Sequence, residues 1–171
     1  VGMLGRVVGV FIFAANLNIL YMQSTAMTEL LLMATMTAAV YELLLWSKNE
    51  TTLYLLRSSF WIMLATLIRY DGWFLLAYAT GLLGLILIKK RGYKATEGTL
   101  IFFCTLGGLG IALWFLWNLL IFKDPLYFAF GPYSARAQQE QIEQAGLLMT
   151  KGNLFTSMQV YFYALVFNTG I

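Results

Sequence analysis

Histidine is absent from this sequence of 171 residues, and cysteine and proline are nearly absent. Without histidine the chain has no imidazole for catalysis and no histidine ligand for a metal ion. Cys104 is the single cysteine, so no disulfide can form within the chain. Its place in an apolar run gives no information about the redox compartment. Histidine-based catalysis and histidine metal sites are therefore excluded within this chain.

Charge is also scarce. Charged residues make up 11% of the chain, whereas a soluble domain usually carries about 25%. Hydrophobic residues make up 60%, and the mean hydropathy is +0.74. This leaves too little polar surface to cover a water-soluble globule, so the bilayer must be much of the solvent. The net charge of +3 is too small to indicate a nucleic-acid partner.

Apolar stretches fill most of the chain and predict an all-α, polytopic helix bundle. A bilayer-spanning helix needs roughly 20 apolar residues, with about 17–25 tolerated. In the middle of one stretch, Gly107, Gly108 and Gly110 favour close helix packing. We expect about five to six spans, and the candidates are residues 4–22, 29–47, 53–70, 73–88, 98–122 and 154–171.

Both ends of the sequence suggest that it is part of a longer protein. The chain starts at Val1 without an initiator methionine, and it stops at Ile171 at the end of an apolar run. We therefore expect a fragment of a longer membrane protein.

Lysine and arginine are divided unequally between two sets of loops. One set holds seven, which are Arg6, Lys48, Arg57, Lys89, Lys90, Arg91 and Lys94. The other set holds four, which are Arg69, Lys123, Arg136 and Lys151. Because cytoplasmic loops carry the excess of positive charge, the first set is predicted to face the cytoplasm.

The outer face then includes residues 122–153. Within this segment, Ser134–Gly146 has the pattern of a short polar helix that Ser134 caps and Gly146 closes. We expect residues 1–171 to form part of one transmembrane domain, with residues 122–153 as an outer-face loop that carries a short surface helix.

The segment from Arg69 to Trp73 places charge where one apolar stretch ends and the next begins. Ionisable residues in membrane segments are costly and are functional candidates by default. An arginine at the edge of a bilayer suits a phosphate, which it can bind through two parallel donors. The structural alternative is an ion pair between Arg69 and Asp71, with Tyr70 and Trp73 as interfacial anchors.

Glu29 is the next candidate, at the outer start of the second apolar stretch. One interpretation is structural: with Thr25 and Thr28 it caps a helix whose positive dipole end attracts the carboxylate. The other is functional: the carboxylate binds a cation or a sugar hydroxyl at the membrane boundary. The spacing leaves both interpretations open.

Three further residues complete the set of candidates. Asn118 lies near the outer end of the fifth stretch, where a buried amide often links helices. Tyr133 and Arg136 lie in the outer segment, where an exposed charge on a helix is often inert. Glu42 is left out of the site, because it can pair locally near Trp46.

Several segments together resemble the membrane glycosyltransferases of the GT-C type. The most similar branch is the family 39-like proteins of bacteria and archaea, relatives of protein O-mannosyltransferases and aminoarabinose transferases. The order and spacing of the segments are more specific than any one of them. They are Asn18–Glu29, Ala65–Trp73, Trp117–Asn118, Asp124–Phe128 and Pro132–Gln138.

The resemblance implies an enzyme of the plasma membrane that transfers a sugar with inversion of configuration at its anomeric carbon. The donor would be a polyprenyl-phosphate sugar, and the acceptor a protein, lipid or glycan on the outer face. It implies a GT-C-like bundle among membrane lipids. We expect no nucleic-acid partner and no cofactor, and no metal because two carboxylates from different loops do not make a metal site by themselves. The resemblance also implies that the catalytic carboxylate lies in a first outer loop upstream of Val1, so the catalytic base stays unassigned.

By the same resemblance, the substrate-binding residues are the candidates Glu29, Arg69, Tyr70, Asp71, Asn118, Tyr133 and Arg136. The phosphate ligand would be Arg69 or Arg136, and Glu29 or Asp71 would orient the sugar. One departure concerns Glu29: relatives often have proline after this acid, and here Leu30 follows.

Two other functions stay open. A transporter or flippase could line a substrate path with the same charges, and a non-catalytic scaffold could use them only as ion pairs. Transporters often have broken helices near the midplane, whereas here the charges gather at one face and no apolar stretch has an interior proline. These points favour a site at the face of the membrane. Only the resemblance separates the enzyme from the scaffold.

Overall fold

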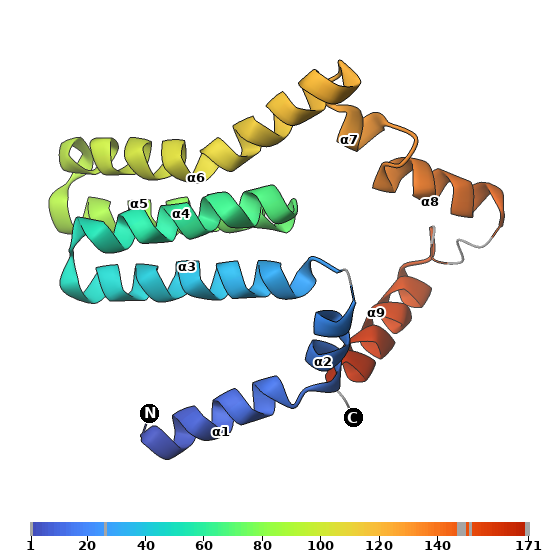
Figure 1. Ribbon diagram of the computed structural model, residues 1–171, viewed down its shortest axis with the longest axis horizontal. Helices are drawn as coiled ribbons and strands as arrows, with labels where there is room; N and C mark the ends of the chain where they lie inside the picture. Colours follow the sequence, from blue (N-terminus) through green and yellow to red (C-terminus); the bar gives the residue numbers. More distant parts are fainter. Residues whose placement is uncertain (1, 26, 147–149, 151, 170–171) are drawn as a thin grey trace. The chain divides into compact units, whose positions relative to one another are not determined.

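The computed structural model describes residues 2–25, 27–146, 150 and 152–169, and within these it contains helices and no strands (Figure 1). The all-α prediction is therefore confirmed for the described part of the chain. The helices are α1 (Met3–Ala14), α2 (Leu17–Ser24), α3 (Glu29–Asn49), α4 (Thr52–Ile68), α5 (Asp71–Arg91), α6 (Tyr93–Phe122), α7 (Tyr127–Phe130), α8 (Ala135–Gln144) and α9 (Leu154–Thr169).

The chain divides into two compact units. Thr28–Pro125 forms one, which we call the four-helix unit because it contains α3 to α6. Val1–Met27 and Leu126–Ile171 together form the other, which we call the terminal unit. The residues expected to bind substrate are divided between them.

Three described helices are long and apolar enough to cross a membrane: α3, α5 and the part of α6 from Thr96 to Phe122. They have 21, 21 and 27 residues. The pair α1 and α2 would add a fourth span if the two helices act together, while α4 and Leu154–Phe167 are shorter apolar helices. These helices are compatible with a membrane protein.

The first apolar stretch, residues 4–22, is broken into two helices. Asn16 is the reason, because its Oδ1 accepts hydrogen bonds from the backbone nitrogens of Asn18 and Ile19, at 2.9 and 3.4 Å. Its side chain thereby caps a new helix that begins at Leu17. The axes of α1 and α2 differ by 56° as a result.

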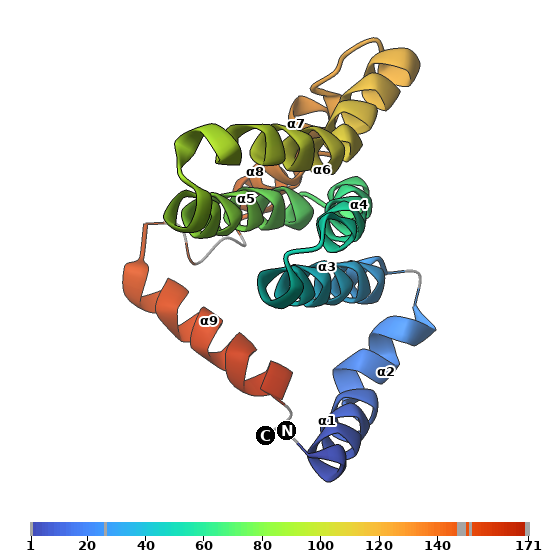
Figure 2. The same cartoon turned by 90° about the vertical axis from the view of Figure 1, so that its left-hand side faces the viewer.

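In the four-helix unit, α4 packs against α3, α5 and α6. Figures 1 and 2 show α3 and α6 on opposite sides of the α4–α5 pair. Short turns reverse the chain between consecutive helices, so the start of α3, the end of α4 and the start of α5 meet at one end of the unit. The buried apolar core consists of Ala39, Trp46, Leu55, Ile62, Ala79, Leu83, Leu87 and Phe103.

Glycine sets the closest helix approaches in this unit. A Cβ on Gly110 of α6 would lie 2.4 Å from the carbonyl oxygen of Met63 in α4, and one on Gly107 would lie 2.7 Å from Leu76 Cδ1. A Cβ on Gly72 would lie 2.4 Å from the backbone carbonyl of Ala65, across the tight turn between α4 and α5. The packing role predicted for the glycines of the fifth stretch is confirmed at Gly107 and Gly110.

In the terminal unit, the predicted polar helix is present as α8. Ser134 Oγ accepts a hydrogen bond from the backbone nitrogen of Ala137 at 3.2 Å, as expected for an N-terminal cap. Gly146 follows the helix with a φ of +71°, a conformation that glycine adopts without strain. The short helix α7 packs against α8.

Candidate functional site

Three predicted residues meet at one end of the four-helix unit. Glu29 is the first residue of α3, Asp71 is the first residue of α5, and Arg69 directly follows α4. We call these three residues the Arg69 cluster. Each charge suits its place, because a carboxylate is favoured at a helix N-terminus and a cation at a C-terminus.

One guanidinium bridges the two carboxylates. Arg69 Nη1 donates to Glu29 Oε1, and Arg69 Nε donates to Asp71 Oδ2 at 3.1 Å. The three side chains are 41%, 37% and 57% exposed, in the order Arg69, Glu29, Asp71. Ion pairs this exposed contribute about 0–1 kcal/mol each to stability. The formal charge of the cluster is −1, because two carboxylates share one cation.

The structure also decides between the two interpretations of Glu29 in part. Thr28 makes no capping hydrogen bond to the described residues, and Thr25 Oγ1 instead donates to the carbonyl of Met22 at 3.2 Å. Capping by these two hydroxyls is therefore wrong. Glu29 Oε2 is buried and has no hydrogen-bond partner among the described residues, which leaves one acceptor of the cluster unsatisfied.

A hollow of about 230 Å³ adjoins Arg69. Its lining comes from the end of α4, the following turn and α6, namely Thr66, Leu67, Ile68, Arg69, Tyr70 and Trp114. Small-molecule sites typically combine apolar and aromatic walls with a few polar groups. Here the hollow supplies apolar and aromatic walls, and the Arg69 cluster supplies the polar groups.

Aromatic contacts hold the turn that carries Arg69. Trp73 Nε1 donates to the carbonyl oxygen of Thr66 at 3.1 Å. The ring of Tyr70 meets that of Trp73 edge-on, with centroids 5.6 Å apart, and Trp73 in turn contacts Phe115 of α6 at 5.9 Å. Tyr70 therefore supports the turn, while the residue stays 46% exposed beside the hollow.

Asn118 has a role inside its own helix. It is buried, and its Nδ2 donates to the carbonyl oxygen of Trp114 at 2.8 Å. Trp114 also lines the hollow, so this bond links Asn118 to the hollow through the backbone of α6.

Tyr133 and Arg136 belong to the terminal unit. Arg136 Nε donates to Glu140 Oε1 one turn later, at 3.0 Å, and the two side chains are 69% and 57% exposed. Tyr133 is 83% exposed. The Arg69 cluster belongs to the other unit.

Sequence reasoning missed a second ionic cluster at the opposite end of the four-helix unit. Glu50 accepts from Lys90 Nζ at 2.6 Å and from Arg91 Nη2 at 2.8 Å. These two hydrogen bonds lower the pKa of Glu50 from 4.5 to about 2, and the bond from Lys90 has the larger effect. The run of cations from Lys89 to Arg91 is visible in the sequence. Its partner Glu50 lies 40 residues before Lys90, and no local sequence pattern marks it.

Glu42 also differs from expectation. No ion pair with Glu42 occurs among the described residues, and its Oε2 is buried without a hydrogen-bond partner there. No group of three or more Cys, Asp or Glu residues that could hold a metal ion is found in the described ranges.

No family model, curated protein or solved structure matches this chain.

Proposed function

We propose that the protein is a polytopic membrane glycosyltransferase of the GT-C type. It would move a sugar from a polyprenyl-phosphate donor to a protein, lipid or glycan acceptor at the outer face of the membrane, with five to six spans. Two observations support this: the ordered segments that resemble the family, and the Arg69 cluster, which carries the proposal. Two carboxylates and a cation gather at one end of three apolar helices, next to an aromatic-lined hollow.

Each residue of the Arg69 cluster has its own role in the proposed function. Glu29 and Asp71 accept hydrogen bonds from sugar hydroxyls, because both side chains are partly exposed. Arg69 fixes the orientation of both carboxylates. A guanidinium has five N–H donors and two are used here, so the rest can reach an oxygen of the donor phosphate.

In the proposed reaction, the bond from the anomeric carbon to the phosphate oxygen breaks as the acceptor hydroxyl oxygen bonds to that carbon. A general base removes the hydroxyl proton, and no residue of this chain is assigned to that step. The polyprenyl phosphate leaves with the bonding electrons, and nearby N–H donors stabilise its charge. The formal charge of −1 on the cluster opposes a phosphate, so we assign sugar binding to the cluster before phosphate binding.

The ion pairs themselves favour a second candidate function. A guanidinium that already bridges α3 and α5 could serve only to hold helix ends together, as in a non-catalytic membrane scaffold. An exchange of the charges at positions 29 and 69 distinguishes the scaffold from the transferase. In Glu29→Arg/Arg69→Glu the pair between positions 29 and 69 is retained, the pair with Asp71 is lost, and the groups offered to a sugar are rearranged.

The test is transfer of radiolabelled sugar from membrane lipid to any acceptor, in membranes with and without the intact protein and with a suitable donor lipid shown to be present. A labelled product that requires the protein supports the transferase and identifies the acceptor class. The charge-exchange variant should insert normally and fail to form product. If inserted protein forms no product at all, the scaffold or a transporter is favoured.

A further inference from the structure

Helices α3 and α5 are tied together at both ends of the four-helix unit. At one end Arg69 joins their first residues, and at the other Glu50, just after α3, pairs with Lys90 and Arg91 at the end of α5. Between these ties the two helices make few direct contacts, while each of them packs against α4. The arrangement leaves a space between two fixed points.

That space is a groove of about 230 Å³ between α3 and α5. Its walls are almost entirely apolar, with Val40, Leu43 and Trp46 on α3 and Tyr78, Leu82 and Ile86 on α5. The hydroxyl of Ser47, also in the wall, already donates to the carbonyl oxygen of Leu44 at 2.8 Å. The groove therefore suits a hydrocarbon ligand.

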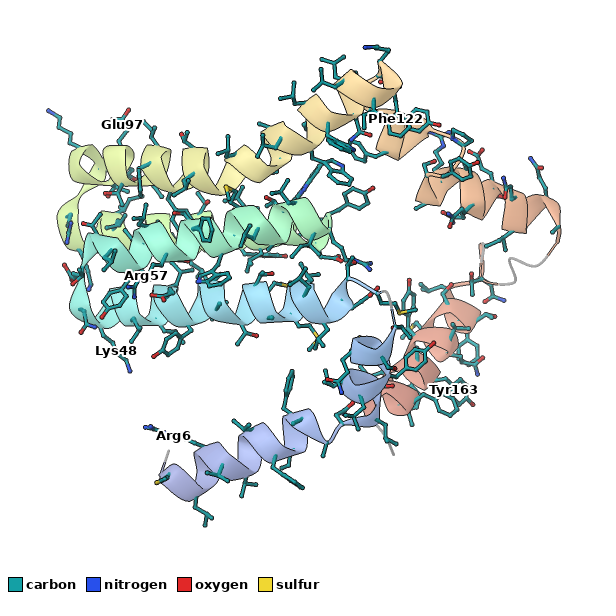
Figure 3. The ribbon with its side chains drawn as sticks, viewed as in Figure 1. Arg6, Lys48, Arg57, Glu97, Phe122 and Tyr163 are labelled. Carbon is teal, nitrogen blue, oxygen red and sulfur yellow. The ribbon has the colours of Figure 1, made fainter. Side chains whose placement is uncertain are left out.

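The groove leads to the basic end of the unit. Ile86 precedes Lys89 by less than one helical turn, and Ser47 directly precedes Lys48. Figure 3 shows Lys48 and Glu97 at this end. Lys48, Lys89 and Lys94 are exposed and make no ion pair with the described residues. Five cations face two carboxylates here, which leaves a formal charge of +3; they are Lys48, Lys89, Lys90, Arg91 and Lys94 against Glu50 and Glu97.

We propose that the α3–α5 groove binds one acyl chain of an anionic glycerophospholipid, whose phosphate lies among the lysines at the basic end. The inference rests on the membrane location proposed above and is independent of sugar transfer. Basic pockets between membrane helices are suited to anionic headgroups because phosphate accepts charge-assisted hydrogen bonds.

The length of the groove suits a lipid chain. The groove wall runs from Leu75 to Ile86 on α5, which is roughly 17 Å at 1.5 Å per residue. One leaflet of a bilayer core is about 15 Å thick, so a single acyl chain matches this length.

The experiment is native mass spectrometry of the intact, detergent-purified protein after titration with phosphatidylglycerol or phosphatidylcholine of identical acyl chains. We expect preferential retention of phosphatidylglycerol. Lys89→Gln and Lys94→Gln should each weaken it about fivefold, since a cation near an anionic headgroup contributes about 1 kcal/mol. Lys123→Gln, at the other end of α6, is the control and should change nothing.

A second pair of variants tests the groove itself. Leu82 lines it and Leu85 does not, yet both lie on α5 and are 60% and 62% exposed. Leu82→Trp should fill the groove and reduce retention of phosphatidylglycerol several-fold, while Leu85→Trp should leave it unchanged. Circular dichroism checks that each variant is folded. Equal retention of both lipids, or equal behaviour of the two tryptophan variants, would overturn the proposal whether or not the protein transfers sugar.

Discussion

The contact of α6 with α4 at Gly110 gives the most quantitative prediction. In Gly110→Ala the new Cβ would lie 2.4 Å from the carbonyl oxygen of Met63 and 2.2 Å from Thr66 Oγ1. The Thr66 hydroxyl can rotate, but the backbone oxygen can move only with its helix. Reaching an ordinary contact of about 3.4 Å requires α4 and α6 to separate by roughly 1 Å, which forfeits a quarter to a half of the attraction of the atoms along the contact.

Overpacking of this kind typically costs about 1–3 kcal/mol, and we expect the upper part of that range because the obstacle is backbone. Gly81→Ala is the matched control, since Gly81 lies within α5 and no described atom would come within 4 Å of its Cβ. Alanine should stabilise that helix by about 0.5–1 kcal/mol. Reversible unfolding in mixed detergent, followed by circular dichroism, measures both. Equal stability of the two variants would refute the close approach of α4 and α6.

Three further predictions concern single contacts. Gly72→Ala should destabilise the four-helix unit in the same unfolding assay, by at least as much as Gly110→Ala, because its Cβ would lie 2.4 Å from both atoms of the Ala65 carbonyl. Because the pKa of Glu50 is lowered to about 2, its ion pairs should stabilise the fold above pH 4.5 and lose that effect as pH falls toward 2. The stability difference between wild type and Glu50→Gln should therefore shrink over that window, and a constant difference would contradict the pairing. Ser134→Ala should destabilise α8 by about 1 kcal/mol and speed amide exchange at Ala137, whereas Ser134→Thr should keep the cap.

Local patterns predicted the helices of the four-helix unit well. Residues 29–47 and 98–122 correspond to α3 and to most of α6, and the Ser134 cap was predicted by its position before a polar helix. The stretch 73–88 extends to Asp71 and Arg91 as α5, because an acid at the start and cations at the end favour the helix dipole. A membrane helix can therefore extend beyond its apolar stretch and include charged residues at both ends.

The pairings between helix ends could not be predicted from such patterns. Arg69 and Glu29 are 40 residues apart, as are Lys90 and Glu50, and each pair depends on how α3, α4 and α5 pack. Sequence reasoning placed Glu29, Arg69 and Asp71 on one face of the membrane but gave no partner for any carboxylate across the bundle. The break at Asn16 was marked only by a polar residue within an apolar run, where its capping side chain outweighs continuation of the helix.

The most direct measurement of the central claim compares sugar transfer and stability in Arg69→Ala, with Arg57→Ala as the control. Arg57 is an exposed arginine of α4 that makes no ion pair with the described residues. Two exposed ion pairs are worth at most about 2 kcal/mol, so Arg69→Ala should still insert and fold. We predict that Arg69→Ala loses transfer by about 100-fold or more, because Glu29 and Asp71 lose the guanidinium that orients them for the sugar, while Arg57→Ala keeps it. Normal transfer in Arg69→Ala would contradict the account.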